Sequence, residues 1–123
     1  MILMTSLLIV DDDERMRSLI RSIVADLADP ITECGDGAEA QAIYERDRPH
    51  WVLMDVMMPG MNGFEATSKI VAFDPSAKVV IVTGNESQRL RDASTSAGAC
   101  AFVSKENLLD LRQMIQPGSS FSV

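Results

Sequence analysis

The chain has 123 residues, of which 46% are hydrophobic, and its formal net charge is −7 at pH 7. This length predicts one compact domain over residues 1–117, with a tail or the start of a linker over 118–123. No cluster of Lys or Arg interleaves with aromatic residues, so the domain lacks the electrostatic footprint of a nucleic-acid-binding domain. The apolar N-terminus has no preceding basic residue and is interrupted by Thr5 and Ser6, so we expect neither a signal peptide nor a membrane span, and a cytoplasmic location.

Strand-like and helical patterns alternate through the first half of the chain. The apolar residues from Met16 to Leu27 recur every three or four positions, which is the period of an amphipathic helix. Asp29-Pro30 is expected to end that helix, and Pro49 to end the next one, which is rich in Ala and Glu. We predict, in chain order, a strand over 7–10, a helix over 16–27, a strand over 31–34, a helix over 38–46 and a strand over 51–54.

The second half continues this alternation but contains one weak helix. Asn85 and Gln88 suit the N-cap and N3 positions of that helix. Its apolar stripe consists only of Leu90, Ala93 and Ala97, so little apolar area anchors it and it is a candidate moving part. The predicted elements are a helix over 64–72, a strand over 78–82, the weak helix over 86–97, a strand over 101–104 and a short helix over 108–115 that Pro117 ends.

Five strands that alternate with five helices predict a doubly wound α/β fold. Right-handed crossovers would cover both faces of a parallel sheet with helices. In such a sheet the carboxyl ends of the strands meet at the edge where open α/β sheets bind ligands. Four of the predicted strands end on residues suited to phosphoryl chemistry, namely Asp11 and Asp12, Asp55, Thr83 and Gly84, and Lys105. One site can therefore collect all of these residues.

Asp55 is the candidate nucleophile of this site. It lies between a buried strand and a loop rich in turn formers, so its carboxylate is expected to be exposed and yet held in place. An aspartate can attack phosphorus and form an acyl phosphate. Asp12 and Asp55 could ligate Mg2+ while Asp11 holds a ligand water. Without the metal, repulsion among the three carboxylates should raise one or more of their pKa values.

Donors for a phosphoryl group follow the last two strands. Thr83 offers a hydroxyl, Gly84 a backbone N–H without an obstructing side chain, and Lys105 a flexible positive charge. All three would be aimed at the place where negative charge develops. Taken singly, Thr83 and Gly84 are typical of an ordinary strand end, and Lys105 is typical of a solvated surface charge. Only the joint pattern is specific.

The run of acidic residues after the first strand also has a structural explanation. An acidic cap at the start of a helix interacts favourably with the helix dipole. We assign Asp13 to that role, whereas Asp11 and Asp12 taken alone fit a cap and a metal ligand equally well.

The segment from Asp55 to Gly63 reads DVMMPGMNG. Together with Asp11-Asp12 before it and with Thr83-Gly84 and Lys105 after it, this segment resembles the CheY-like receiver domain of two-component response regulators. The resemblance covers residues from about 6 to 116 and implies a flavodoxin-like sheet with strand order 2-1-3-4-5.

The resemblance also implies a function. Asp55 would accept a phosphoryl group from the phosphohistidine of a sensor histidine kinase or of a phosphotransfer protein, and the domain would catalyse only its own phosphorylation and dephosphorylation. Thr83 and Phe102 would form a switch pair, in which the hydroxyl is drawn toward the phosphate and the ring turns inward. A downstream output partner or a missing C-terminal effector domain would respond. The Mg2+ ligands would be Asp11, Asp12, Asp55 and the backbone carbonyl of Met57.

The residue after Lys105 departs from many receivers, which have proline there, often in a cis bond. Here it is Glu106, for which a cis bond would cost about 3 to 4 kcal/mol, so we expect a trans bond. A non-proline residue at this position resembles receivers that precede a helix-turn-helix domain.

Two other functions compete with this one. A haloacid dehalogenase-type phosphatase would use Asp55 as nucleophile, but it needs a second aspartate where this chain has Met57. A nucleotide- or flavin-binding module would need a glycine-rich phosphate loop after the first strand, and that loop is missing.

The remaining polar and sulfur-containing residues are assigned structural roles. Cys34 and Cys100 form no C-x-x-C pair and would lie on opposite edge strands, so we expect both to be reduced. His50 has no His or Cys neighbour at ligand spacing and is expected to be structural. The eight methionines are expected to fill the core and the loops.

Overall fold

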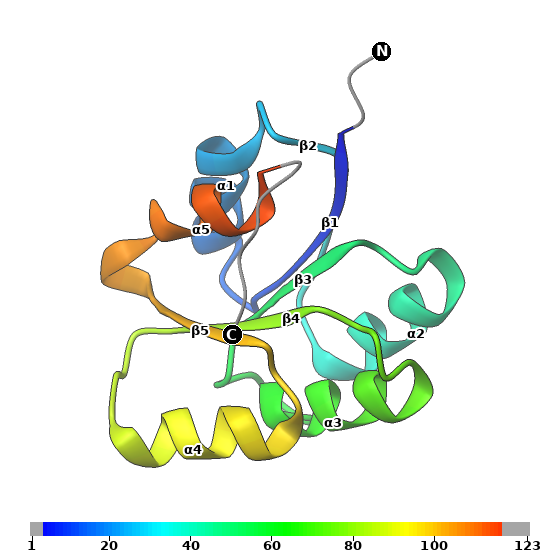
Figure 1. Cartoon of the computed structure of the whole chain (residues 1–123), viewed down its shortest axis with the longest axis vertical. Helices are drawn as coiled ribbons and strands as arrows, with labels where there is room; N and C mark the ends of the chain where they lie inside the picture. The colour runs from blue at the N-terminus through cyan, green and yellow to red at the C-terminus, as the bar shows by residue number, and fades with distance from the viewer. Residues whose placement is uncertain (1–3, 117–123) are drawn as a thin grey trace.

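A computed structural model describes residues 4–116 of the chain (Figure 1). In chain order its elements are β1 (Thr5–Val10), α1 (Glu14–Val24), β2 (Ala28–Cys34), α2 (Gly37–Asp47), β3 (Trp51–Met54), α3 (Gly63–Phe73), β4 (Val79–Thr83), α4 (Gln88–Ala97), β5 (Ala101–Ser104), the 3-10 helix η1 (Lys105–Asn107) and α5 (Asp110–Ile115). Strands and helices therefore alternate over the described part of the chain. None of its helices is long and apolar enough to cross a membrane.

The strands form one parallel sheet in the order β2-β1-β3-β4-β5. Helices α1 and α5 cover one face of the sheet, and α2, α3 and α4 cover the other (Figure 1). The predicted doubly wound fold and the strand order implied by the resemblance are both confirmed. All carboxyl ends of the strands consequently lie along one edge of the sheet.

Two apolar cores hold the layers together. In β1, Leu8 and Val10 belong to the core beneath α2 and α3, whereas Leu7 and Ile9 belong to the core beneath α1 and α5. This alternation is the two-residue period of a strand that is covered on both faces. The central strands β1, β3 and β4 are buried almost throughout, so the polar residues that follow them start from a rigid base.

The boundary between α1 and β2 differs from the prediction. Helix α1 ends at Val24, and Leu27 lies in a turn where its apolar side chain still packs on the core. Strand β2 already begins at Ala28, so Pro30 lies inside the strand rather than ending the helix. The strand tolerates proline because β2 is at the edge of the sheet and its register with β1 shifts between Thr5 and Leu7.

The predicted N-cap of α4 is also wrong. Asn85 accepts a hydrogen bond from the backbone N–H of Ser87 at 3.0 Å, which closes a local turn. Ser87 is the actual N-cap, since its hydroxyl accepts from the backbone N–H of Leu90 at 3.2 Å. The weak anchoring is confirmed, because Ser94 and Ala97 are the only buried residues of this helix.

The last elements, a strand and a short helix, are of the predicted types. The peptide bond between Lys105 and Glu106 is trans, and η1 leads into a short α5. Arg112 of α5 forms an ion pair with Asp26 at 2.7 Å and donates to the carbonyl of Ile23 at 2.7 Å, which ties α5 to the end of α1. The predicted helix stop at Pro117 and the tail over 118–123 lie outside the described residues.

Candidate functional site

Asp55 directly follows the last residue of β3 and is buried. Its backbone N–H donates to the carbonyl of Val10 at 2.9 Å, which continues the pairing of β3 with β1. The residue is only 6% exposed, so the expectation of an exposed carboxylate is wrong. The reason is that the following loop returns to this position, where the backbone N–H of Gly63 donates to the carbonyl of Val56 at 3.0 Å.

Gly63 makes this return of the loop possible. A Cβ atom at residue 63 would lie 2.0 Å from the carbonyl oxygen of Asp55, so any side chain would force the two backbones apart. Helix α3 begins at this glycine, and the side chain of Asn62 caps it by accepting from the backbone N–H of Glu65 at 3.0 Å. Gly63 therefore sets how closely α3 approaches the candidate nucleophile.

Three carboxylates meet at the carboxyl edge of the sheet. Asp11, Asp12 and Asp55 each place a carboxylate oxygen within 4.8 Å of the others, and Asp12 is the exposed member. Oδ1 of Asp11 accepts from the backbone N–H of Asp13 at 2.9 Å. Asp13 caps α1 as predicted, by accepting from the backbone N–H of Arg15 at 2.9 Å.

Lys105 bridges the two buried carboxylates. Its Nζ lies 3.0 Å from Oδ2 of Asp11 and 3.1 Å from Oδ1 of Asp55. Burial raises the pKa of Asp55, the charge of Asp11 adds to this shift, and Lys105 opposes it. Burial disfavours the charged form of Lys105, but its hydrogen bonds to Asp11 and Asp55 outweigh that effect, and the pKa of Lys105 is raised.

The charges of this cluster suit a divalent cation. Three carboxylates and one ammonium group leave two negative charges uncompensated. Mg2+ prefers oxygen ligands and is commonly held by one or two carboxylates together with water. The donor set of Asp11, Asp12 and Asp55 therefore fits Mg2+. The backbone carbonyl of Met57 as a further ligand stays a prediction, and the side chain of Met57 is exposed.

Thr83 and Phe102 lie on neighbouring strands at the α4 side of the sheet. Phe102 pairs with Ile81 across β4 and β5, and Thr83 is two residues further along β4. Residues two apart on a strand share a face, so the buried Thr83 side chain and the half-buried Phe102 ring lie on the same face. The hydroxyl of Thr83 accepts from the backbone N–H of Asn85 at 3.3 Å, while Gly84 borders open space.

Two arginines near this site were not predicted from the sequence. The guanidinium of Arg91, in α4, lies 4.6 Å from the centre of the Phe102 ring and also contacts Glu86 at 3.4 Å. Arg17 of α1 donates to the carbonyl of Asp11 at 2.7 Å and pairs with Glu33 of β2 at 3.1 Å. The contacts of Arg91 with Phe102 and of Arg17 with Glu33 join residues of different elements, so no local sequence pattern marks them.

His50, Cys34 and Cys100, which the sequence assigns to structural roles, link or border strands of the sheet. Nδ1 of His50 accepts from the backbone N–H of Ser6 at 3.0 Å, and the backbone N–H of His50 donates to the Ser6 hydroxyl at 2.9 Å, which links β1 to the start of β3. Cys34 and Cys100 lie at opposite edges of the sheet and are free thiols. Burial raises the pKa of Cys34 to about 12, so its thiol is unreactive.

The strand order and the acidic cluster at the carboxyl edge define a flavodoxin-like α/β domain whose charged site lies where such sheets bind ligands. The family model of the response regulator receiver domain matches residues 7–116. The chain therefore belongs to the response regulator receiver domain family, and the CheY-like resemblance of its sequence is confirmed.

Individual relatives agree with this assignment. Protein CcdB of Bacillus subtilis is 40% identical over 103 residues, which cover 83% of this chain and 86% of CcdB. The chemotaxis protein CheY of Listeria monocytogenes is 39% identical over 103 residues, which cover 83% of this chain and 87% of CheY. Among solved structures, the CheX-CheY-BeF3-Mg2+ complex of Borrelia burgdorferi matches with a TM-score of 0.81 and 26% identity, over 89% of this chain and 84% of that chain.

Proposed function

We propose that this receiver domain is the phosphoacceptor switch of a two-component phosphorelay and that Asp55 accepts the phosphoryl group. One observation carries the proposal: a single ammonium group, Nζ of Lys105, contacts the buried carboxylates of both Asp11 and Asp55. Asp55 is thus held at the end of a rigid strand, next to a cation and to a cluster that suits Mg2+. These are the requirements for moving a phosphoryl group onto a carboxylate.

The chemical step is an in-line displacement at phosphorus. A carboxylate oxygen of Asp55 forms a bond to the phosphorus of a phosphohistidine while the bond from phosphorus to the imidazole nitrogen breaks, and the electron pair leaves with the imidazole. Lys105 offers its ammonium group to the incoming phosphoryl oxygens, and Thr83 and Gly84 offer a hydroxyl and a backbone N–H. Mg2+, held by Asp11, Asp12, Asp55 and the carbonyl of Met57, supplies charge neutralisation when bound.

The same site can be coupled to the α4 side of the domain, which is the surface formed by α4, β5 and α5. When the phosphate is present, the Thr83 hydroxyl exchanges its bond to the Asn85 backbone for one to a phosphoryl oxygen, and the loop before α4 follows. Helix α4 buries few residues, so little packing opposes this movement. The half-buried Phe102 ring then turns inward. The outcome is a shift between two packings of the surface formed by α4, β5 and α5.

The partners follow from this chemistry. We propose that a sensor histidine kinase or a phosphotransfer protein donates the phosphoryl group, and that an output partner or a C-terminal effector domain responds to the α4 side. The domain catalyses only its own phosphorylation and dephosphorylation. A phosphatase that acts on other substrates would need a general acid at position 57, and the thioether of Met57 carries no proton to donate.

Intact-mass analysis tests the phosphoacceptor. The full chain is incubated with acetyl phosphate and Mg2+, alongside Asp55→Asn and the control Asp13→Asn, which changes the helix cap and leaves the cluster intact. We expect one acid-labile phosphoryl adduct on the wild type and on Asp13→Asn, and none on Asp55→Asn. A phosphoryl adduct that persists on Asp55→Asn would show that another residue is the acceptor.

A further inference from the structure

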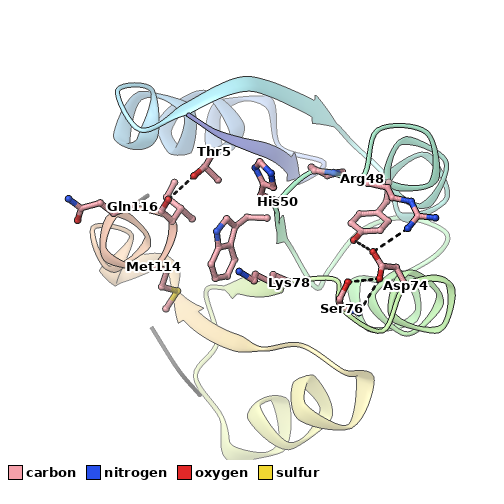
Figure 2. Close-up of a pocket in the computed structure, with 12 residues that line it drawn as sticks. Thr5, Arg48, His50, Asp74, Ser76, Lys78, Met114 and Gln116 are labelled. Carbon is pink, nitrogen blue, oxygen red and sulfur yellow. Dashed lines mark hydrogen bonds and ion pairs between the residues drawn. The ribbon is translucent and has the colours of Figure 1, made fainter. Parts of the chain in front are cut away.

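A hollow lies at the amino ends of the central strands, at the opposite end of the sheet from Asp55. Its volume is about 360 Å3, within the size range of small-molecule sites. It is bordered by the first residues of β1 and β3, by the loop before β4 and by the end of α5. Figure 2 shows Met114 and Gln116 on one side of this hollow, Arg48, Asp74 and Ser76 on the other, and His50 and Lys78 between the two sides. Because β3 separates it from the acidic cluster, this amino-edge hollow is a distinct place on the molecule.

The only carboxylate in the described lining of the amino-edge hollow is already satisfied. Oδ2 of Asp74 accepts from the hydroxyl of Tyr44 at 2.7 Å. Oδ1 of Asp74 accepts from the backbone N–H of Ser76 at 3.0 Å and from the Ser76 hydroxyl at 2.7 Å. These bonds and the nearby guanidinium of Arg48, at 3.8 Å, hold the pKa of Asp74 below its ordinary value. Asp74 therefore acts as part of the wall.

The hydrogen-bond donors of the hollow, in contrast, have N–H groups that can still donate to a ligand. Lys78 is exposed and has no carboxylate within 4.0 Å among residues 4–116, and its Nζ lies 5.1 Å from the centre of the Trp51 ring. His50 uses Nδ1 to accept from the backbone N–H of Ser6, which assigns the proton to Nε2 and leaves that N–H as a donor. Arg48 contacts Asp74 only at long range and retains further N–H groups.

The charge of the hollow is opposite to that of the whole chain. Its lining has two cations, Arg48 and Lys78, against the single carboxylate of Asp74, although the chain carries a net charge of −7. The apolar part of the lining includes Trp51, Met114 and Ile115, which are themselves buried. A ligand would therefore be recognised mainly by its charged and hydrogen-bonding groups, and these must be acceptors.

We propose that the amino-edge hollow binds a small molecule carrying phosphate or carboxylate groups. Lys78 provides the principal charge, since it lies inside the hollow beside Trp51 and lacks a carboxylate partner in the described chain. Arg48 and the Nε2–H of His50 provide further donors at the rim. This site is spatially separate from the phosphoacceptor site, because no residue of the acidic cluster contributes to it.

NMR titration of the 15N-labelled full chain tests the proposal. Inorganic pyrophosphate and citrate are added separately, without Mg2+, so that phosphate and carboxylate ligands are distinguished. We expect saturable amide shifts near residues 48–51 and 74–78 with at least one of the two probes. Lys78→Met should weaken binding about tenfold or more, as expected for the loss of a charge-assisted hydrogen bond. Lys69→Met, which removes an exposed lysine outside the hollow, should leave binding unchanged.

Two further observations decide the outcome. Lys78→Arg keeps a cation that binds phosphate and carboxylate, so it should retain binding, which separates loss of charge from loss of fold. The proposal is overturned if neither probe gives saturable shifts, if Lys78→Met binds as tightly as Lys69→Met, or if the shifts lie around Asp11, Asp55 and Lys105 instead. In the last case the anion would occupy the receiver site alone.

Discussion

Lys105 is the residue on which the charge balance of the phosphoacceptor site depends. Two buried carboxylates share its ammonium group, and without it both would lack a cationic partner in the described chain. The pKa of Asp55 is nevertheless raised, which shows that one ammonium group does not offset the burial of this acid and its neighbour Asp11. The remaining negative charge favours the binding of a divalent cation, and such a cation would attract the oxygens of a phosphoryl group.

Gly63 offers a stability test at the residue scale. We predict that Gly63→Ala lowers the free energy of unfolding by about 2 to 3 kcal/mol, because its Cβ would collide with the backbone of Asp55. Gly84→Ala is the matched control, since a Cβ there has no heavy atom within 4 Å, and it should change the free energy by less than about 1 kcal/mol. Urea unfolding of the three proteins measures both effects. Equal stabilities of the two variants would contradict the close approach of α3 to Asp55.

Helix α4 is the element that the site can move most easily. It buries only the small residues Ser94 and Ala97, and the guanidinium of Arg91 stacks on the Phe102 ring of β5. Helix α1 also buries two residues, but these are the larger apolar side chains of Ile20 and Val24. The contact between Arg91 and Phe102 is therefore one of the contacts that hold α4 against β5.

A double-mutant cycle tests this contact between α4 and β5. Arg91→Ala and Phe102→Leu are made singly and together, and the coupling free energy should be about 0.5 to 1 kcal/mol, as for an exposed cation–π pair. Arg89→Ala combined with Phe102→Leu is the control. Arg89 lies two positions before Arg91 in α4, but it forms no ion pair or ring contact in the described chain. A coupling of zero for Arg91, or an equal coupling for Arg89, would rule out this role.

The elements also show which features a sequence pattern can predict. Strands and helices were correct in type and order because binary patterning and the Gly and Pro breaks agree with the fold. The errors lie where two local signals compete. Asn85 and Ser87 are both good N-caps, and Leu27 has the spacing of a helix residue while serving as a turn residue that packs on the core. The sequence alone predicts a helix stop at Pro30, because the position of β2 at the sheet edge is a tertiary property.

In the whole molecule, charged side chains gather at both ends of the parallel strands of one sheet. The carboxyl edge has the acidic cluster, and the amino edge has the hollow that contains Lys78. The residues of the first site were predictable because each follows a strand end. The contact of Gly63 with Asp55, the bridge formed by Lys105 and the amino-edge hollow were not predictable in detail, since they depend on how elements far apart in the chain pack.

Metal binding should stabilise the whole fold. We predict that Mg2+ at ten times its dissociation constant raises the free energy of unfolding by about 1.4 kcal/mol, because it binds the folded arrangement of Asp11, Asp12 and Asp55 and relieves their repulsion. Asp12→Ala should remove most of this gain, whereas Asp13→Ala should retain it. Thermal unfolding with and without Mg2+ measures the effect. Equal gains in the wild type and in Asp12→Ala would place the metal elsewhere.

The central claim is that charge added at Asp55 changes the packing of the α4 side, and amide hydrogen exchange with the phosphoryl mimic beryllofluoride tests it most directly. Exchange is measured on the full chain with Mg2+, with and without the mimic, and Asp55→Asn serves as the control that should not respond. We predict that protection changes mainly over residues 84–106, which contain α4, β5 and the start of η1. Unchanged protection over these residues, with the mimic demonstrably bound at Asp55, would contradict this account of the switch.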